Sequence, residues 1–212
     1  MTISLDLADN FSGLKKSISA MEKQVSENPE NYQLMHQLGY HYYLLGHFEE
    51  AVKIFDNVID KNPNFALAYY YQGLSYYRLA RLDQAMKCLI LAVGVEPEFC
   101  MALYHIGLIH FQMGNPTKAI DTLSKCLVRD SESLIALYDL ACIHISLDQN
   151  KEAIELLERF LELDSQNAFA YYQLGVAFDK LGWQNESKLH LQKALELNPN
   201  IENAEKILGV MN

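Results

Sequence analysis

The stretch from Tyr32 to Phe65 reads YQLMHQLGYHYYLLGHFEEAVKIFDNVIDKNPNF and contains one complete structural period. Its first part carries apolar residues at steps of three and four, which is the spacing of one face of an α-helix. Gly46 and His47 interrupt this stripe, and a second helical stripe follows up to Asn62–Pro63. The residue before a proline is disfavoured in a helix. The stretch therefore predicts a helix, a tight turn, a second helix and a proline-marked turn.

Small residues and helix breakers repeat this pattern every 34 residues along the chain. One register holds Gly39, Gly73, Gly107, Ala141, Gly175 and Gly209, and a second holds Ala51, Ala85, Ala119, Ala153 and Ser187. Prolines 29, 63, 97 and 199 keep the same step, and Gly46, Gly114 and Gly182 recur at twice the period. No insertion breaks the register. We expect the small residues to let the two helices of one unit approach closely.

The residues Leu38–Gly39, Tyr42, Ala51, Phe55 and Pro63 resemble the tetratricopeptide repeat signature. The resemblance covers residues 32–201 as five units, although serines replace the terminal proline in two units and histidines replace the first-helix aromatic in two. It implies an all-α fold, a right-handed α-solenoid of helix–turn–helix 34-residue repeats.

We expect one domain over residues 1–212. Residues 1–31 supply an N-terminal segment and a capping helix with an apolar face at Leu14, Ile18, Met21 and Val25. Residues 202–212 supply a C-terminal capping helix, because the terminal units of a repeat array need a solvent-facing cover.

The amino-acid composition indicates which classes of function we expect and which we do not. The chain has 17 Lys+Arg against 27 Asp+Glu, a net charge of −10, and 50% hydrophobic residues, so we expect a soluble protein that does not bind nucleic acid. No apolar run is long enough to span a membrane, and Asp6 and Asp9 do not fit a secretory signal. The four cysteines show no C-x-x-C pair, so we expect buried or half-buried thiols in a reducing compartment and a cytoplasmic protein.

In the family that this chain resembles, first-helix residues line a concave groove. Five sets of residues, each stepping by 34, would line it here, and 18 of their 25 side chains are apolar or Tyr or Cys. We expect partner binding by Leu67, Tyr70, Leu74, Tyr77, Met101, Tyr104, Leu108, Phe111, Ile135 and Tyr138. Two alternatives stay open: the tyrosine ladder can be ordinary scaffold, and the aliphatic residues can pack against neighbouring helices.

The groove chemistry favours one kind of ligand. His36 and Tyr40 stand where a carboxylate clamp of this family would need Lys and Asn, so an acidic C-terminal tail is disfavoured. We predict a non-enzymatic adaptor, chaperone or assembly factor that binds an apolar helix or peptide of another protein. The alternatives are a self-associating structural protein, whose groove is filled in a homo-oligomer, and a carrier of an apolar small molecule.

No catalytic residue, cofactor or metal site is expected. Histidine pairs such as His36 and His41 are five residues apart, whereas metal-binding pairs on a helix are three or four apart. Trp183 is either a contact anchor or a packing residue over a helix junction.

Overall fold

A computed structural model describes residues 17–210, and every regular element within that range is a helix. The contacts divide the chain into two compact units, residues 1–109 and 110–212. The single domain over 1–212 stays a prediction, and Leu14 of the proposed capping helix lies outside the described residues.

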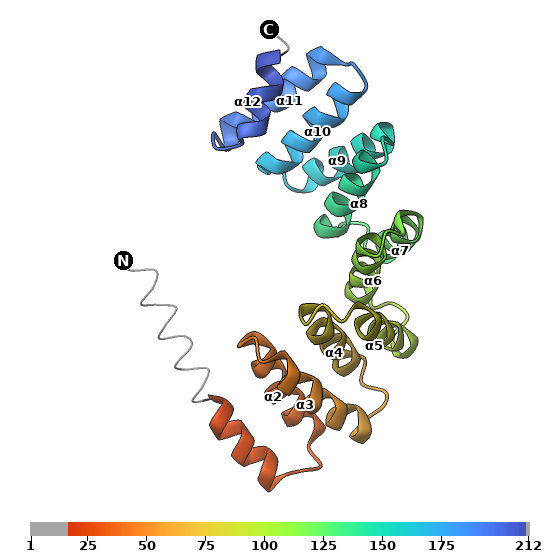
Figure 1. The fold of residues 1–212 in the computed structure, drawn as a ribbon, viewed down its shortest axis with the longest axis vertical. Coiled ribbons are helices and arrows are strands. Elements are labelled where there is room, and N and C mark those ends of the chain that lie inside the picture. Colours follow the sequence, from red (N-terminus) through yellow and green to blue (C-terminus); the bar gives the residue numbers. More distant parts are fainter. Residues whose placement is uncertain (1–16, 211–212) are drawn as a thin grey trace, which may run out of the picture. The chain divides into compact units, whose positions relative to one another are not determined.

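The first unit contains a helix at residues 17–27 and then helices that each pack against the next (Figure 1). Their bounds are α2 Tyr32–Leu44, α3 Phe48–Lys61, α4 Ala66–Arg78 and α5 Leu82–Val95, followed by α6 Cys100–Gln112, which begins in this unit and ends in the second. The remaining helices are α7 Pro116–Arg129, α8 Leu134–Ser146, α9 Asn150–Leu163, α10 Ala168–Lys180, α11 Gln184–Leu197 and α12 Glu202–Val210. First helices start at 32, 66, 100, 134 and 168, which confirms the all-α repeat fold.

The turn inside each helix pair uses one left-handed residue. Gly46, Gly114 and Gly182 have φ of 79°, 74° and 76°, and the same register holds Ala80 at 58° and Asp148 at 57°. The glycines at twice the period therefore mark a backbone requirement that all five turns share, and in two turns a residue with a Cβ meets it.

The close approach expected within each helix pair is confirmed at the glycine register. A Cβ at Gly175 would lie 2.7 Å from Leu191 Cγ, and one at Gly73 would lie 2.9 Å from Leu89 Cγ. These leucines are fully buried. The repeated small residue thus lets a leucine of the second helix fill the space against the first helix.

Layers of buried side chains connect consecutive helices. In the first unit one cluster joins Phe55 and Val58 of α3 to α2 and α4, and another joins Leu89 of α5 to α4 and α6. In the second unit Leu191 of α11 packs with α12. Each helix pair therefore buries its apolar face against the next, as repeat architectures require.

Candidate functional site

One register position of the first helices presents apolar side chains to solvent. In the first unit Leu67 of α4 is 37% exposed and Met101 of α6 is 38% exposed. In the second unit Ile135 of α8 is 43% exposed and Phe169 of α10 is 55% exposed. The members of each pair stand on first helices of consecutive repeats. We call Leu67 and Met101 the apolar face of the first unit, and Ile135 and Phe169 the apolar face of the second unit.

The ten expected partner-binding residues do not share one environment. Tyr70 and Leu74 are buried, each with 7% of its surface exposed, so neither offers apolar surface to a partner. Half-buried residues are Tyr77, Tyr104, Leu108 and Tyr138, and exposed ones are Leu67, Met101, Phe111 and Ile135. The expectation of an open floor fails at Tyr70 and Leu74, where the packing alternative describes the structure.

Aromatic contacts account for the burial of Tyr70. Its ring lies 4.8 Å from that of Phe99 and 5.6 Å from that of His105, measured between ring centroids. Burial raises the pKa of the Tyr70 hydroxyl, because the phenolate would lose its hydration. Leu74 belongs to the same buried cluster, together with Leu89 and Ile106. This part of the tyrosine ladder is scaffold.

Two histidines on the first helices of the first unit are poorly suited to bind a carboxylate. The ring of His36 packs against Phe55, Phe65 and Tyr71, and its Nε2 is buried with no hydrogen-bond partner. Burial lowers the pKa of His36, and it also lowers the pKa of His105 despite the hydrogen bond that Nδ1 of His105 donates to the Met101 carbonyl. Both rings are therefore neutral at physiological pH.

Two first-helix cations already have partners inside their own unit. The Arg78 guanidinium lies 4.9 Å from the centre of the Phe48 ring, within the range of a cation–π contact. The Lys180 ammonium donates to the Ile145 carbonyl at 3.0 Å and to Asp148 Oδ1 at 2.7 Å. An anionic ligand would have to compete with these contacts, which agrees with the prediction that an acidic tail is disfavoured.

Family models match three segments of the sequence. Models of the tetratricopeptide repeat match residues 36–89 and 170–201, and a model of subunit 3 of the anaphase-promoting complex, or cyclosome, matches residues 90–160. The chain belongs to the tetratricopeptide repeat family. None of the curated proteins compared with the sequence matches it.

Solved structures of other tetratricopeptide repeat proteins share this fold. YrrB, described as having an unusual peptide-binding site, is 19% identical with a TM-score of 0.75, and the match covers 90% of this chain and 98% of YrrB. MamA is 22% identical with a TM-score of 0.73, covering 82% and 96%. The Cut9–Hcn1 hetero-tetramer of the APC/C is 21% identical with a TM-score of 0.70, covering 94% of this chain and 40% of the other. At these identities the likeness establishes the fold alone.

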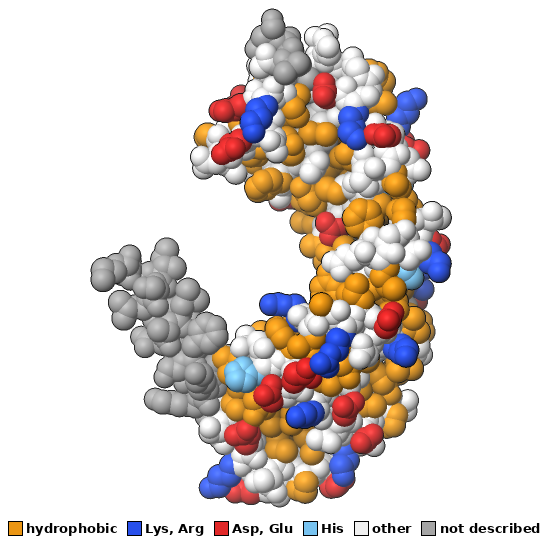
Figure 2. All heavy atoms as spheres, in the orientation of Figure 1, with side chains coloured by type: hydrophobic (Ala, Val, Ile, Leu, Met, Phe, Trp, Pro, Cys, Tyr) orange, Lys and Arg blue, Asp and Glu red, His pale blue; other side chains and the backbone are white. Residues whose placement is uncertain are grey.

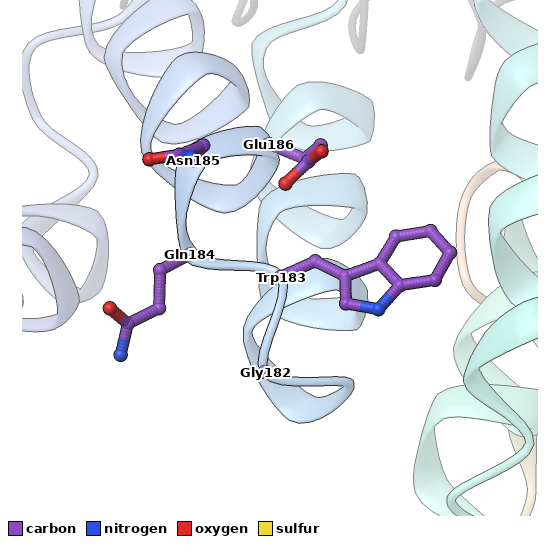
Figure 3. A pocket seen from close by; sticks show the side chains of 5 residues that line it. All are labelled: Gly182, Trp183, Gln184, Asn185 and Glu186. Carbon is purple, nitrogen blue, oxygen red and sulfur yellow. The ribbon is translucent and has the colours of Figure 1, made fainter.

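Trp183 packs on its own helix junction, and its role as a contact anchor stays a prediction. Its ring stacks on Phe178 at 5.8 Å with 25° between the ring planes, yet 49% of the residue is exposed. A hollow of about 490 Å³ is lined by the consecutive residues 182–186 of this tetratricopeptide repeat turn. Figure 3 shows the Trp183 and Gln184 side chains pointing away from each other. These two side chains therefore do not converge on one point of the hollow, as the groups that orient a ligand in a pocket do.

The cysteines require a correction. Cys88 and Cys142 are free, and burial raises the pKa of each thiol to about 11. Cys100 and Cys126 are disulfide-bonded, so the expectation of four thiols is wrong. Since disulfides are typical of oxidising compartments, the cysteines no longer support a reducing location.

Within residues 17–210 no group of three or more His, Cys, Asp or Glu side chains is placed to hold a metal ion. In the same described range, no helix has the length and apolar character needed to cross a membrane.

The candidate set omitted exposed residues that the tetratricopeptide repeat register could have indicated. Phe169 is 55% exposed and shares the register of Leu67, Met101 and Ile135. Leu44 at the end of α2 is 48% exposed, and it stands at a register that is polar or charged in the other first helices. The sequence also contains a signal on the second helix α5, because Ile90 and Leu91 are apolar at positions where the other second helices carry polar or charged residues.

Proposed function

We propose that this chain is a non-enzymatic protein-interaction scaffold, an adaptor, chaperone or assembly factor, which binds an apolar helix or peptide of a partner protein through the apolar face of one of its units. The observation that carries the proposal is the repeated exposure of Leu67 and Met101 in one unit and of Ile135 and Phe169 in the other. Regular exposure of apolar side chains at one register position marks a surface that a partner covers. The peptide-binding site described for YrrB supports this use of the fold.

The affinity that this surface can supply is modest for each residue. Burying a fully exposed Leu or Met side chain is worth about 1.5–3 kcal/mol, and Leu67 and Met101 retain a little over a third of their exposure. Covering that remainder contributes about 0.5–1 kcal/mol per residue. Truncating both to alanine should therefore weaken partner binding about 5- to 30-fold.

The half-buried tyrosines of the candidate set fit the rim of such a site. Tyr77 and Tyr104 in the first unit and Tyr138 in the second combine a packed ring with a polar end. A tyrosine hydroxyl at the edge of an apolar contact can satisfy a polar group of the bound segment. Leu108 and Phe111 extend the apolar character of α6 beyond Met101.

The test compares proteins retained from a native lysate by the wild type and by L67E/M101E, identified by mass spectrometry. A specific partner should be retained by the wild type and lost by the variant, because carboxylates on the apolar face would have to be desolvated. The matched control N57E/N64E adds the same charge at exposed positions of the first unit and should retain the partner. Equal retention by L67E/M101E with unchanged circular dichroism would contradict the proposal.

Two measurements on the purified wild type address the alternative functions. A concentration-dependent dimer in sedimentation that L67E/M101E abolishes would indicate self-association instead. A non-protein mass that co-purifies with the chain, and is lost in the same variant, would indicate a carrier of an apolar small molecule.

A further inference from the structure

The second helix α5 exposes two adjacent aliphatic side chains. Ile90 is 55% exposed and Leu91 is 52% exposed, although α5 also buries Leu89 completely against its own unit. A helix that is apolar on both its inner and its outer side is expected to be covered on both. About half of the surface of Ile90 and of Leu91 stays uncovered on the outer side of α5.

The same register positions are polar in every other second helix. Counting in steps of 34 from Ile90 and Leu91, the equivalent pairs are Asp56 and Asn57 in α3, Ser124 and Lys125 in α7, Glu158 and Arg159 in α9, and Gln192 and Lys193 in α11. These residues show that the repeat does not need an apolar side chain there. The aliphatic pair on α5 therefore has a cause outside the packing of the repeat. Figure 2 shows apolar side chains interspersed with charged ones over the first unit, where α5 lies.

Gly94 extends this surface by one helical turn. It lies three and four residues after the aliphatic pair and is exposed, and a Cβ built on it meets no atom within 4 Å. Gly73, by contrast, is held against Leu89, and Gly46 occupies a left-handed turn. A glycine inside an exposed helix lowers helix stability, but it permits another backbone to approach closely. We call Ile90, Leu91 and Gly94 the α5 ridge.

Size and charge indicate what kind of partner would cover the ridge. Two half-exposed aliphatic side chains offer on the order of 100 Å² of apolar surface, whereas a stable complex buries about 800 Å² per partner. A dimer held by this ridge alone is therefore not supported, and a single helix is a closer match in size. The last turn of α5 has no basic residue and is followed by the exposed carboxylate of Glu96. The helix C-terminus adds partial negative charge.

We propose that the α5 ridge is a second docking surface that takes an amphipathic helix of another protein. The apolar side of that helix covers Ile90 and Leu91, its backbone passes close to Gly94, and its basic residues face the acidic end of α5 at Glu96. This surface is separate from the apolar face of the first helices, so the proposal does not depend on the proposed function.

The probe is a synthetic 16-residue helical peptide with Leu and Ala on one face and Lys on the other, titrated into the full chain. Amide chemical shifts and peptide anisotropy report its binding. We expect saturable shift changes centred on residues 82–98. A matched peptide with Glu in place of Lys should bind at least tenfold more weakly. Equal binding of the two peptides, or shifts confined to the region of Leu67 and Met101, would overturn the proposal.

The decisive variant transfers the α3 pair onto α5 as I90D/L91N. It should weaken binding of the Lys peptide at least tenfold, even though it adds a negative charge that attracts the peptide. The control K125N changes the net charge by the same amount on α7 and should bind like the wild type. Unchanged binding by I90D/L91N would overturn the proposal. A wild-type dimer in sedimentation that I90D/L91N abolishes would also overturn it, because the ridge would then bind a second copy.

Gly94 supplies a test that is independent of the folding of I90D/L91N. The substitution G94Q introduces a better helix former into an open position and should raise Tm. It should nevertheless weaken binding of the Lys peptide about fivefold or more, because the new side chain keeps the peptide backbone away. A rise in Tm with unchanged affinity would show that the absence of a side chain at Gly94 has no role in docking.

Discussion

Two leucines of α4, seven residues apart, should differ in what their truncation to alanine costs. Leu74 is 7% exposed and packs in a buried cluster with Tyr70, Leu89 and Ile106, whereas Leu67 is 37% exposed. We predict that Leu74→Ala lowers stability strongly and that Leu67→Ala lowers it slightly but weakens partner binding.

The loss in free energy of unfolding for each variant follows from how deeply the leucine is buried. Leu→Ala in a core costs about 2–5 kcal/mol, since the loss of apolar burial is joined by a cavity that the surroundings do not fill. Nearly complete burial places Leu74→Ala near 3 kcal/mol. At Leu67 part of the side chain is already in water and solvent can enter the space, so the cost is about 1 kcal/mol.

Urea denaturation followed by far-UV circular dichroism measures the difference. With a urea dependence of about 2 kcal/mol per molar, the midpoint of Leu74→Ala should lie about 1 M below that of Leu67→Ala. Equal shifts for the two variants would refute the reasoning. They would show that Leu67 is as much a part of the core as Leu74 and that the apolar face is closed.

Three further predictions concern single residues in different parts of the fold. Burial lowers the pKa of His36, so the stability that its neutral ring contributes is present above the unfolded pKa of about 6.5 and is lost as pH falls through the folded pKa. The variant His36→Phe should therefore show a smaller fall in Tm between pH 7.5 and 5.5 than the wild type. An unchanged pH profile of Tm would contradict this. Ser187 donates a buried 2.8 Å hydrogen bond to the Gly175 carbonyl. Because this carbonyl lies within a helix and also accepts a backbone hydrogen bond, Ser187→Ala should change the free energy of unfolding by less than about 1 kcal/mol in urea titrations. A loss above about 2 kcal/mol would show that the hydroxyl is required. Ala80 has a φ of 58°, and Ala80→Gly should stabilise the chain by about 0.5–1 kcal/mol in the same assay, whereas destabilisation would show that the turn is not strained.

Much of the fold was accessible from the sequence, because small residues and prolines repeat in register. The glycine register predicted the close approach of two helices, which Gly175 and Leu191 show directly. Ala80 and Asp148 gave no such signal, although they adopt the same left-handed turn as the glycines. Their conformation is imposed by the two helices that the turn joins, so it cannot be read from the residue type.

The candidate site could be predicted only in part, because both sides of a first helix are apolar. Leu67 and Leu74 have the same side chain and fall on the same helical stripe, yet the neighbouring helices cover only Leu74. The repeat register predicted Leu67, Met101 and Ile135 as exposed groove residues, but it predicted Tyr70 as exposed as well. Tyr70 is buried because its ring contacts Phe99 and His105, and the spacing of residues in the sequence does not indicate these contacts.

The central claim is that the exposed register position of the first helices meets a partner. The most direct measurement places a photo-reactive benzoylphenylalanine at position 67, and in a control at position 57 on α3, and identifies the cross-linked products from native lysate by mass spectrometry. We predict a defined adduct from position 67, joined to an apolar helical segment of another protein, and none from position 57. Adducts from position 57 alone, or an unreacted chain at position 67 while the partner is retained, would contradict it.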